Sequence, residues 1–254
     1  DEVREPERAR VARGQAGADP EDQLKGDALR ALWPDLISVE DLLQCLTPPK
    51  QSNFFGAYAG FLDFDLAERL RPGDIPHALR WLKGLAATNR LDFPMRRLAD
   101  QATVLGWQHT NEPSVLQSLA EMSIECFRHY QDPVRNEETV TDHPELFDDP
   151  VLRRRLAARI VELNQDRDTR FELLHRRPRL VRGVEDFAWC VEELKASVGR
   201  TTEPVWAEIA WSLFCWSQPD SARLDAIIEA RAGSPALRKE SDLFFCPVEV
   251  GSER

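Results

Sequence analysis

The feature that most constrains this chain is a helix start that recurs along it. A residue able to cap a helix is followed within two positions by proline, which suits the first helical turn because the missing N–H has no intrahelical partner there. The pattern occurs at Asp19-Pro20, Asp74-Ile75-Pro76, Asp92-Phe93-Pro94, Asn111-Glu112-Pro113, Asp149-Pro150, Thr202-Glu203-Pro204, Ser217-Gln218-Pro219 and Gly233-Ser234-Pro235. The sequence therefore predicts a series of short helices.

Apolar residues after these starts recur at three and four positions, which is the helical period. Strand-like composition is confined to residues 243–250, where Pro247 argues against a strand. The whole pattern predicts an all-α chain of about twelve short helices, in which two neighbours take about 35 to 40 residues, near the size of a HEAT-like unit. We expect an irregular HEAT-like helical-repeat array or superhelix. A compact multi-helix domain is the alternative.

A change in composition predicts the division of the chain. Residues 1–18 have the character of a polar N-terminal arm, and residues 19–131 form the first helical array. Residues 132–149 lack helical periodicity and are acidic, so we predict a linker there. Residues 150–254 form the second array. The acids of the linker region are Asp132, Glu137, Glu138, Asp142, Glu145, Asp148 and Asp149.

The totals exclude several classes of protein. The formal net charge is -11 and the pI is about 5.1, which argues against a surface that is basic throughout and binds nucleic acid or anionic membrane. No apolar run is long enough for a membrane helix, and no signal-peptide core is present near Asp1. Five irregularly spaced cysteines without a C-x-x-C pair are typical of buried, reduced thiols. We therefore expect a cytoplasmic protein.

No motif of catalysis or cofactor binding is complete. The sequence contains no G-x-x-x-x-G-K-[ST], G-x-G-x-x-G or G-x-S-x-G, and its histidines form neither H-x-x-x-H nor H-E-x-x-H. We therefore expect no enzyme activity, no cofactor and no metal site in this chain. A helical enzyme of another kind is a third hypothesis, which would require a buried pocket with perturbed carboxylates.

One segment, residues 151–182, is rich in arginine. Its arginines can line a groove for phosphates, pair with the preceding acidic stretch or contact a protein partner. Phe171 is the one aromatic interleaved with them, so stacking of bases is poorly supported. The candidates for contact with an anion or a partner are Arg153, Arg154, Arg155, Arg159, Arg176, Arg177 and Arg179.

Each tryptophan can either pack in the core or line a groove that binds a peptide. Trp206, Trp211 and Trp216 are spread around one predicted helix, which favours a fully buried helix over a groove for a peptide. Core packing is the default for the other four, at Trp33, Trp81, Trp107 and Trp189.

The least generic stretch runs from Leu29 to Leu62. Ser38 is predicted to cap a helix with an apolar face of Leu42, Leu43, Cys45 and Leu46, which Thr47-Pro48-Pro49 ends. Asn53 is predicted to cap a second helix. In that helix Gly56 and Gly60 lie one turn apart, so we expect another helix to approach closely there.

This stretch resembles the helical region downstream of the nucleotide-binding domain in bacterial NACHT-type NTPases of the STAND class. The resemblance covers about residues 20–90 and is carried by 24–34 (LKGDALRALWP), 46–50 (LTPPK), 53–58 (NFFGAY), Phe61 and Leu62. It implies that junctions between consecutive helices are held by Trp33, Pro34, Thr47, Pro48, Pro49, Gly56 and Tyr58. The P-loop and the magnesium-binding acidic motif of that family are absent, so no nucleotide-contacting residue carries over.

The first functional hypothesis follows from this resemblance. It implies a non-catalytic sensor or scaffold region that regulates an ATP-driven switch, with phage defence as a common role. The expected partner is another protein or the NTPase domain of the same polypeptide, with no membrane contact. The alternative is a helical domain that binds nucleic acid through the arginine cluster within 153–182.

Overall fold

The structure of the chain is a computed structural model that describes residues 10, 19, 22–47, 49, 56–88, 93–129, 142–164, 173–174, 180–196 and 221–232. These residues are mostly helical, and no strand occurs among them. The all-α prediction is therefore confirmed for the described part of the chain. In the same part, no helix is both long and apolar enough to cross a membrane. The predicted helix starts at Thr202 and Gly233 and the segment 243–250 lie outside the described residues.

Two compact units make up the chain, Asp1–Asn164 and Gln165–Arg254. The sequence analysis placed the division in the acidic stretch 132–149, whereas the units divide after Asn164. Residues 150–164 of the expected second array belong to the first unit, because α11 (Pro150–Leu163) packs on α8 (Pro113–Arg128). Before α11, Phe147 is fully buried and packs on Trp107 with 4.8 Å between ring centroids. This contact holds part of the expected linker inside the first unit.

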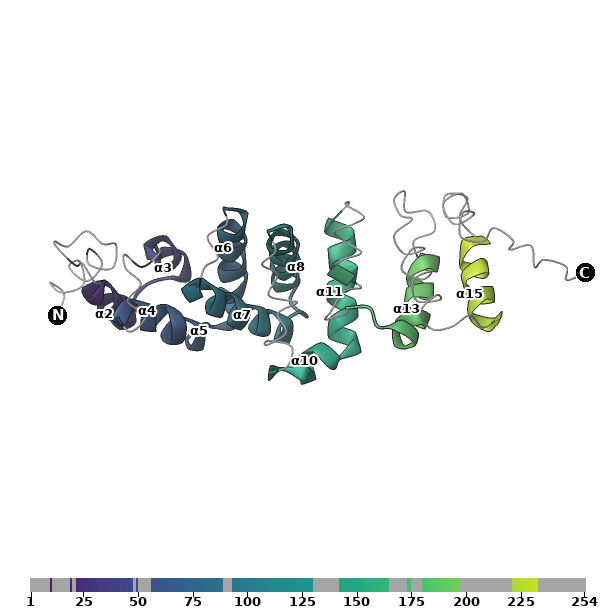
Figure 1. The fold of residues 1–254 in the computed structure, drawn as a ribbon, viewed down its shortest axis with the longest axis horizontal. Coiled ribbons are helices and arrows are strands. Elements are labelled where there is room, and N and C mark those ends of the chain that lie inside the picture. The colour runs from purple at the N-terminus through teal and green to yellow at the C-terminus, as the bar shows by residue number, and fades with distance from the viewer. Residues whose placement is uncertain are drawn as a thin grey trace, which may run out of the picture. The chain divides into compact units, whose positions relative to one another are not determined.

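The helices of the first unit alternate between two layers (Figure 1). We call one the α6 layer; it contains α3 (Val39–Cys45), α6 (Ile75–Ala87), α8 (Pro113–Arg128) and α11 (Pro150–Leu163). The other is the α7 layer, with α2 (Gln23–Leu32), α4 (Ala57–Gly60), the π-helix η1 (Phe61–Asp65), α5 (Leu66–Glu68), α7 (Phe93–Gln108) and α10 (Pro144–Asp148). Each helix packs on its neighbours within the layer, and successive segments cross from one layer to the other.

Two helix starts have the capping bond that the sequence predicts, at Ser38 and Asp149, whereas α6 and α8 begin without a side-chain capping bond. The Ser38 hydroxyl accepts from the Asp41 N–H at 3.1 Å, and the Asp149 carboxylate accepts from the Val151 N–H at 2.7 Å. Proline occupies the first turn of α6, α8, α10 and α11. A 3-10 turn, η2 (Pro72–Asp74), leads into α6. The Asp19 carboxylate accepts from the Lys25 N–H at 3.0 Å and so serves α2 from outside the helix.

Fewer helices than the expected twelve are found in the described residues, where α4, η1 and α5 follow one another without a break. The core of the first unit lies between its two layers and is made mainly of leucine and alanine. Trp33 and Trp107 are buried there as expected. Trp81 and Trp189 are only half-buried, so neither is packed fully in the core as the sequence analysis predicted.

The second unit is described at α13 (Gly183–Ala196) and α15 (Ser221–Ala232), which pack on each other. Phe187, Cys190 and Val191 are buried on α13, and the Arg223 guanidinium of α15 lies 5.9 Å from the Phe187 ring centroid. Trp206, Trp211 and Trp216 lie outside the described residues. Cys45, Cys126 and Cys190 are buried thiols, in agreement with the sequence.

Candidate functional site

The residues of the family-like stretch meet at a junction between α2, the end of α3 and α4. The buried Tyr58 hydroxyl donates to the Thr47 carbonyl at 2.7 Å and accepts from the Thr47 N–H at 2.8 Å. The Lys25 ammonium donates to the Thr47 hydroxyl at 2.7 Å and lies 4.4 Å from the Tyr58 ring centroid. Tyr58 therefore satisfies both backbone groups of Thr47, two residues after α3, and Lys25 contacts both Thr47 and Tyr58. Pro49 is half-buried nearby in sequence, and Pro48 lies outside the described residues.

The close approach of α2 and α4 depends on Gly26, which the sequence analysis did not single out. A Cβ at Gly26 would lie 2.3 Å from the Ala57 carbonyl carbon and 2.3 Å from the Tyr58 nitrogen. At Gly60 the nearest atom would be an Arg30 guanidinium nitrogen, at an ordinary 3.7 Å. Gly56 precedes α4 as an extended residue with φ -74°. Another helix, α2, therefore does approach α4 closely as expected, and the glycine at the contact is Gly26 rather than Gly60.

Trp33 and Pro34 end α2 through a cis peptide bond. The Arg69 guanidinium donates to the carbonyls of Arg30 and Trp33 at 3.0 and 3.1 Å, which satisfies groups that the last turn of a helix leaves unpaired. Asp65 accepts from Arg69 at 3.1 Å and from Arg30 at 2.8 Å. Through Arg69 and Arg30, these contacts hold α2 to the segment formed by η1 and α5.

The junction predicts a specific response to alkali. Burial raises the pKa of the Tyr58 hydroxyl well above its ordinary value of 10.0, although its hydrogen bonds with Thr47 act in the opposite direction. Above about pH 10 the unfolded chain therefore loses a proton that the folded chain keeps, and stability falls as pH rises. We expect Tyr58→Phe to be less stable at neutral pH by about 1–2 kcal/mol. The difference should narrow above about pH 10, as measured by urea unfolding at a series of pH values. If the free energy of unfolding fell equally with pH in the two proteins, this account would be contradicted.

Arg153 of the arginine cluster is part of the core. It is 1% exposed, and its guanidinium donates to the carbonyls of Phe147 at 3.4 Å and Asp148 at 2.7 Å. These carbonyls end α10, where a helix leaves acceptors without intrahelical donors. Arg153 therefore joins the end of α10 to the first turn of α11.

Arg155 and Arg159 connect α11 to neighbouring helices. The Arg155 guanidinium donates to the Thr110 hydroxyl at 3.2 Å, just after α7. Arg159 donates to the Gln117 side chain on α8 and to Glu162 on its own helix. Three described arginines of the cluster thus donate to groups of the protein itself. Arg154 is half-buried, and Arg176, Arg177 and Arg179 lie outside the described residues.

The hydrogen bond from Arg159 to Gln117 belongs to a network of polar side chains across the α6 layer. Gln117 also donates to Glu121 on α8, and Glu121 accepts from the Lys83 ammonium of α6 at 2.9 Å. This hydrogen bond from Lys83 is the main reason that the pKa of Glu121 lies below its ordinary value of 4.5; desolvation opposes the shift. This network of polar side chains links α6, α8 and α11.

Removing Lys83 should change the acid response of the protein. A carboxylate with a lowered folded pKa adds stability above its unfolded pKa, and this stability is lost as pH falls through the folded pKa. We expect Lys83→Met to raise the pKa of Glu121 and to reduce the loss of stability between about pH 5 and pH 3. The cost at neutral pH should stay below about 1 kcal/mol because both groups are partly exposed. Carboxyl NMR titration of Glu121 measures the shift, and an unchanged titration would contradict the assignment.

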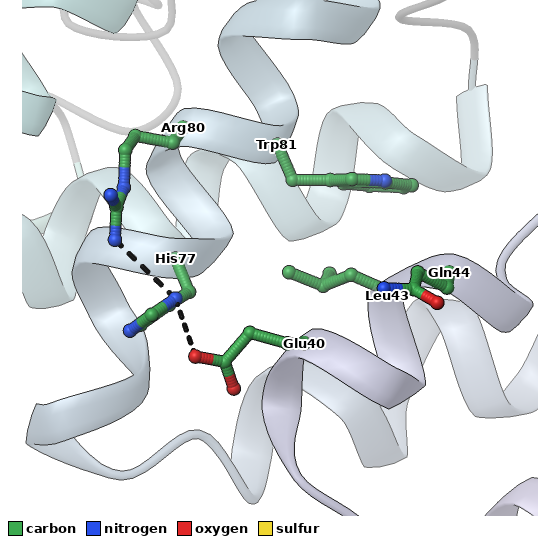
Figure 2. Close-up of a pocket in the computed structure, with 6 residues that line it drawn as sticks. All are labelled: Glu40, Leu43, Gln44, His77, Arg80 and Trp81. Atoms are coloured by element: carbon green, nitrogen blue, oxygen red, sulfur yellow. Dashed lines mark hydrogen bonds and ion pairs between the residues drawn. The ribbon is translucent and has the colours of Figure 1, made fainter.

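A pocket of about 400 Å³ opens between α3 and α6 (Figure 2). Leu43 and Trp81 form its apolar part, while the other lining residues are polar or charged. Those residues are Glu40 and Gln44 of α3 and His77 and Arg80 of α6. Leu43 and Trp81 lie opposite each other between the two helices, and Glu40 and Arg80 both reach His77 (Figure 2).

Glu40 determines which nitrogen of His77 carries a proton. A carboxylate oxygen of Glu40 lies 3.0 Å from His77 Nδ1, which requires N–H at that position. An Arg80 guanidinium nitrogen lies 3.3 Å from the same Nδ1, and it cannot donate there while Nδ1 is protonated. Arg80 donates instead to the Pro76 carbonyl at 3.1 Å. The pair of Glu40 and His77 is therefore a link between α3 and α6, beside a guanidinium with spare donors.

Sequence analysis missed this pocket as a unit, although His77, Arg80 and Trp81 share a face of α6 at helical spacing. The sequence does not indicate that α3 lies opposite that face of α6. Within the described ranges, no group of three or more metal-ligating side chains comes together. In comparisons with known proteins, no family model, no characterised protein and no solved structure matches the chain.

Proposed function

We propose that this chain is a non-catalytic helical-repeat region, HEAT-like in architecture, that binds a protein partner. The observation that supports the proposal is the alternation of successive helical segments between two layers in the first unit. In helical-repeat proteins such an arrangement stacks helix pairs, so that one layer offers a continuous surface for recognition. The α6 layer is the surface that we assign to this role.

The spacing of the helix pairs supports a repeat. Pairs begin at Gln23, Ala57 and Phe93, which are 34 and 36 residues apart. Polar contacts recur between neighbours of the α6 layer: Glu40 with His77, Lys83 with Glu121, and Gln117 with Arg159. A similar length and a similar type of contact at successive interfaces are typical of repeats that contact only their neighbours.

The resemblance of residues 20–90 gives this region its context. We propose that it is the sensor or scaffold part of a bacterial NACHT-like signalling NTPase, acting in the cytoplasm and regulating a nucleotide switch that lies outside this chain. Phage defence is the role that this family context favours. The partner would be another protein or the NTPase domain of the same polypeptide. The structural contacts of Thr47 and Tyr58 agree with the architectural role that the resemblance implies for them.

The experiment begins with the reading frame upstream of Asp1. A P-loop motif after a predicted strand, within a few hundred codons, is the expected result. ATP turnover is then measured for the full-length protein and for a form that lacks residues 19–164. We expect the deletion to change turnover several-fold. A frame without an NTPase domain, or equal turnover in the two forms, would overturn the assignment.

A further inference from the structure

The α3–α6 pocket lies where the short helix α3 faces the N-terminal half of α6. Helix α3 has 7 residues, whereas α6 has 13 and α8, on its other side, has 16. Helix α8 packs along α6 far more extensively than α3 does. Trp81 is half-buried beside Leu43 in the part of α6 that faces α3. The α6 layer therefore has an apolar recess at this interface.

The guanidinium at the recess has no acidic partner among the described residues. Glu40 contacts His77 at 3.0 Å, and no carboxylate of the described residues lies within ion-pairing distance of Arg80. Gln44 is exposed and makes no hydrogen bond to a described residue. The indole N–H of the half-buried Trp81 also makes no hydrogen bond to a described residue. The pocket thus presents one guanidinium without an acidic partner, one amide and one indole N–H around an apolar floor (Figure 2).

We propose that this pocket docks a segment of a partner protein that carries an acidic side chain next to a large apolar one. The apolar side chain packs on Leu43 and Trp81, and the carboxylate pairs with Arg80 in the geometry that a guanidinium favours. Gln44 and the Trp81 indole N–H bond the backbone of the segment. The inference rests on the proposed role in protein binding and names the chemistry of the partner.

The shape of the pocket favours a peptide segment over a small molecule. It is open along one side and is lined by the exposed side chains of Glu40, Gln44 and Arg80. Small-molecule sites enclose most of their ligand. A peptide segment can fill an open recess with one side chain while its neighbours stay on the rim.

The test is selection of random dodecapeptides displayed on phage against the immobilised whole chain. We expect enriched peptides to combine Asp or Glu with Leu, Phe or Trp at neighbouring positions. Arg80→Glu should weaken binding of the selected synthetic peptides at least tenfold, and Gln44→Ala should weaken it less. Arg128→Glu is the matched control, because Arg128 is an exposed arginine of α8 outside the pocket, and it should leave the affinity unchanged.

Three results would overturn the proposal: no enrichment above background, enrichment of basic peptides, or equal affinity for the parent chain and Arg80→Glu. Circular dichroism shows that each variant is folded before its affinity is compared. The proposed regulation of an NTPase is judged separately by ATP turnover. Peptides that bind equally well to Arg80→Glu would remove this pocket as the site and leave the role in protein binding intact.

Discussion

Gly26→Ala is expected to destabilise the first unit by about 3 kcal/mol or more, because the added methyl has no space. Its Cβ would lie 2.3 Å from backbone atoms of both Ala57 and Tyr58, and backbone cannot rotate away as a side chain can. The helices α2 and α4 would have to separate, which would also disturb the hydrogen bonds of Tyr58 with Thr47. Helix propensity alone predicts the opposite sign, since alanine is favoured over glycine by about 1 kcal/mol.

Gly84→Ala is the matched control for this prediction. Gly84 is an exposed residue of α6, and a Cβ there would meet no atom within 4 Å. We expect this variant to gain about 0.5–1 kcal/mol from the reduced freedom of the unfolded chain. Urea unfolding, with hydrogen exchange of peptides from α2 and α4, measures both variants. Equal effects of the two substitutions would show that α2 and α4 do not approach as closely as the structure has them.

The helix starts could be predicted from sequence because their cause is local. Ser38 and Asp149 cap helices through bonds to residues two or three positions away, and proline acts at its own position. Periodic leucine on α6 likewise predicted its buried face, where Leu79 and Leu82 are inaccessible. These features need no knowledge of what packs against the helix.

The features that sequence analysis placed wrongly depend on contacts between distant residues. Gly26 matters only because the start of α4 crosses it, and Gly60 was the more visible candidate because a glycine pair resembles a packing motif. The acidic stretch ends in a helix because Phe147 packs on Trp107. No local sequence pattern indicates this contact. Trp81 lines a pocket because α3, which is distant from it in sequence, lies opposite it.

The arginine cluster illustrates the same limit in charge patterning. A run of arginines predicts an electropositive surface, yet Arg153, Arg155 and Arg159 each donate to groups within the first unit. Sequence gives the charge of a side chain but not whether a carbonyl or hydroxyl lies within its reach. The burial of Arg153 is the extreme case, and it leads to the second large effect that we expect.

Arg153→Leu is expected to destabilise the first unit by about 3 kcal/mol. The substitution keeps an apolar stem in the core but removes the donors that serve the carbonyls of Phe147 and Asp148. The bond to Phe147 is buried and the bond to Asp148 is partly buried. A buried acceptor without a donor costs about 1–3 kcal/mol, and hydrogen bonds to charged groups are at the strong end of the range. Arg159→Leu is the control on the same helix; its side chain is 34% exposed, so we expect a loss below about 1 kcal/mol. Urea unfolding of the whole chain compares the two.

The difference between these variants also determines how nucleic-acid binding by this segment has to be tested. If Arg153 holds α10 to α11, its charge reversal lowers affinity for any ligand by unfolding the first unit, whatever the ligand contacts. Substitutions at Arg176, Arg177 and Arg179 can then report on binding, provided that the unfolding transition of each variant is unchanged. A stable Arg153→Leu protein would instead show that the guanidinium is dispensable for the fold, and the arginines of α11 would become legitimate probes of a phosphate-binding surface.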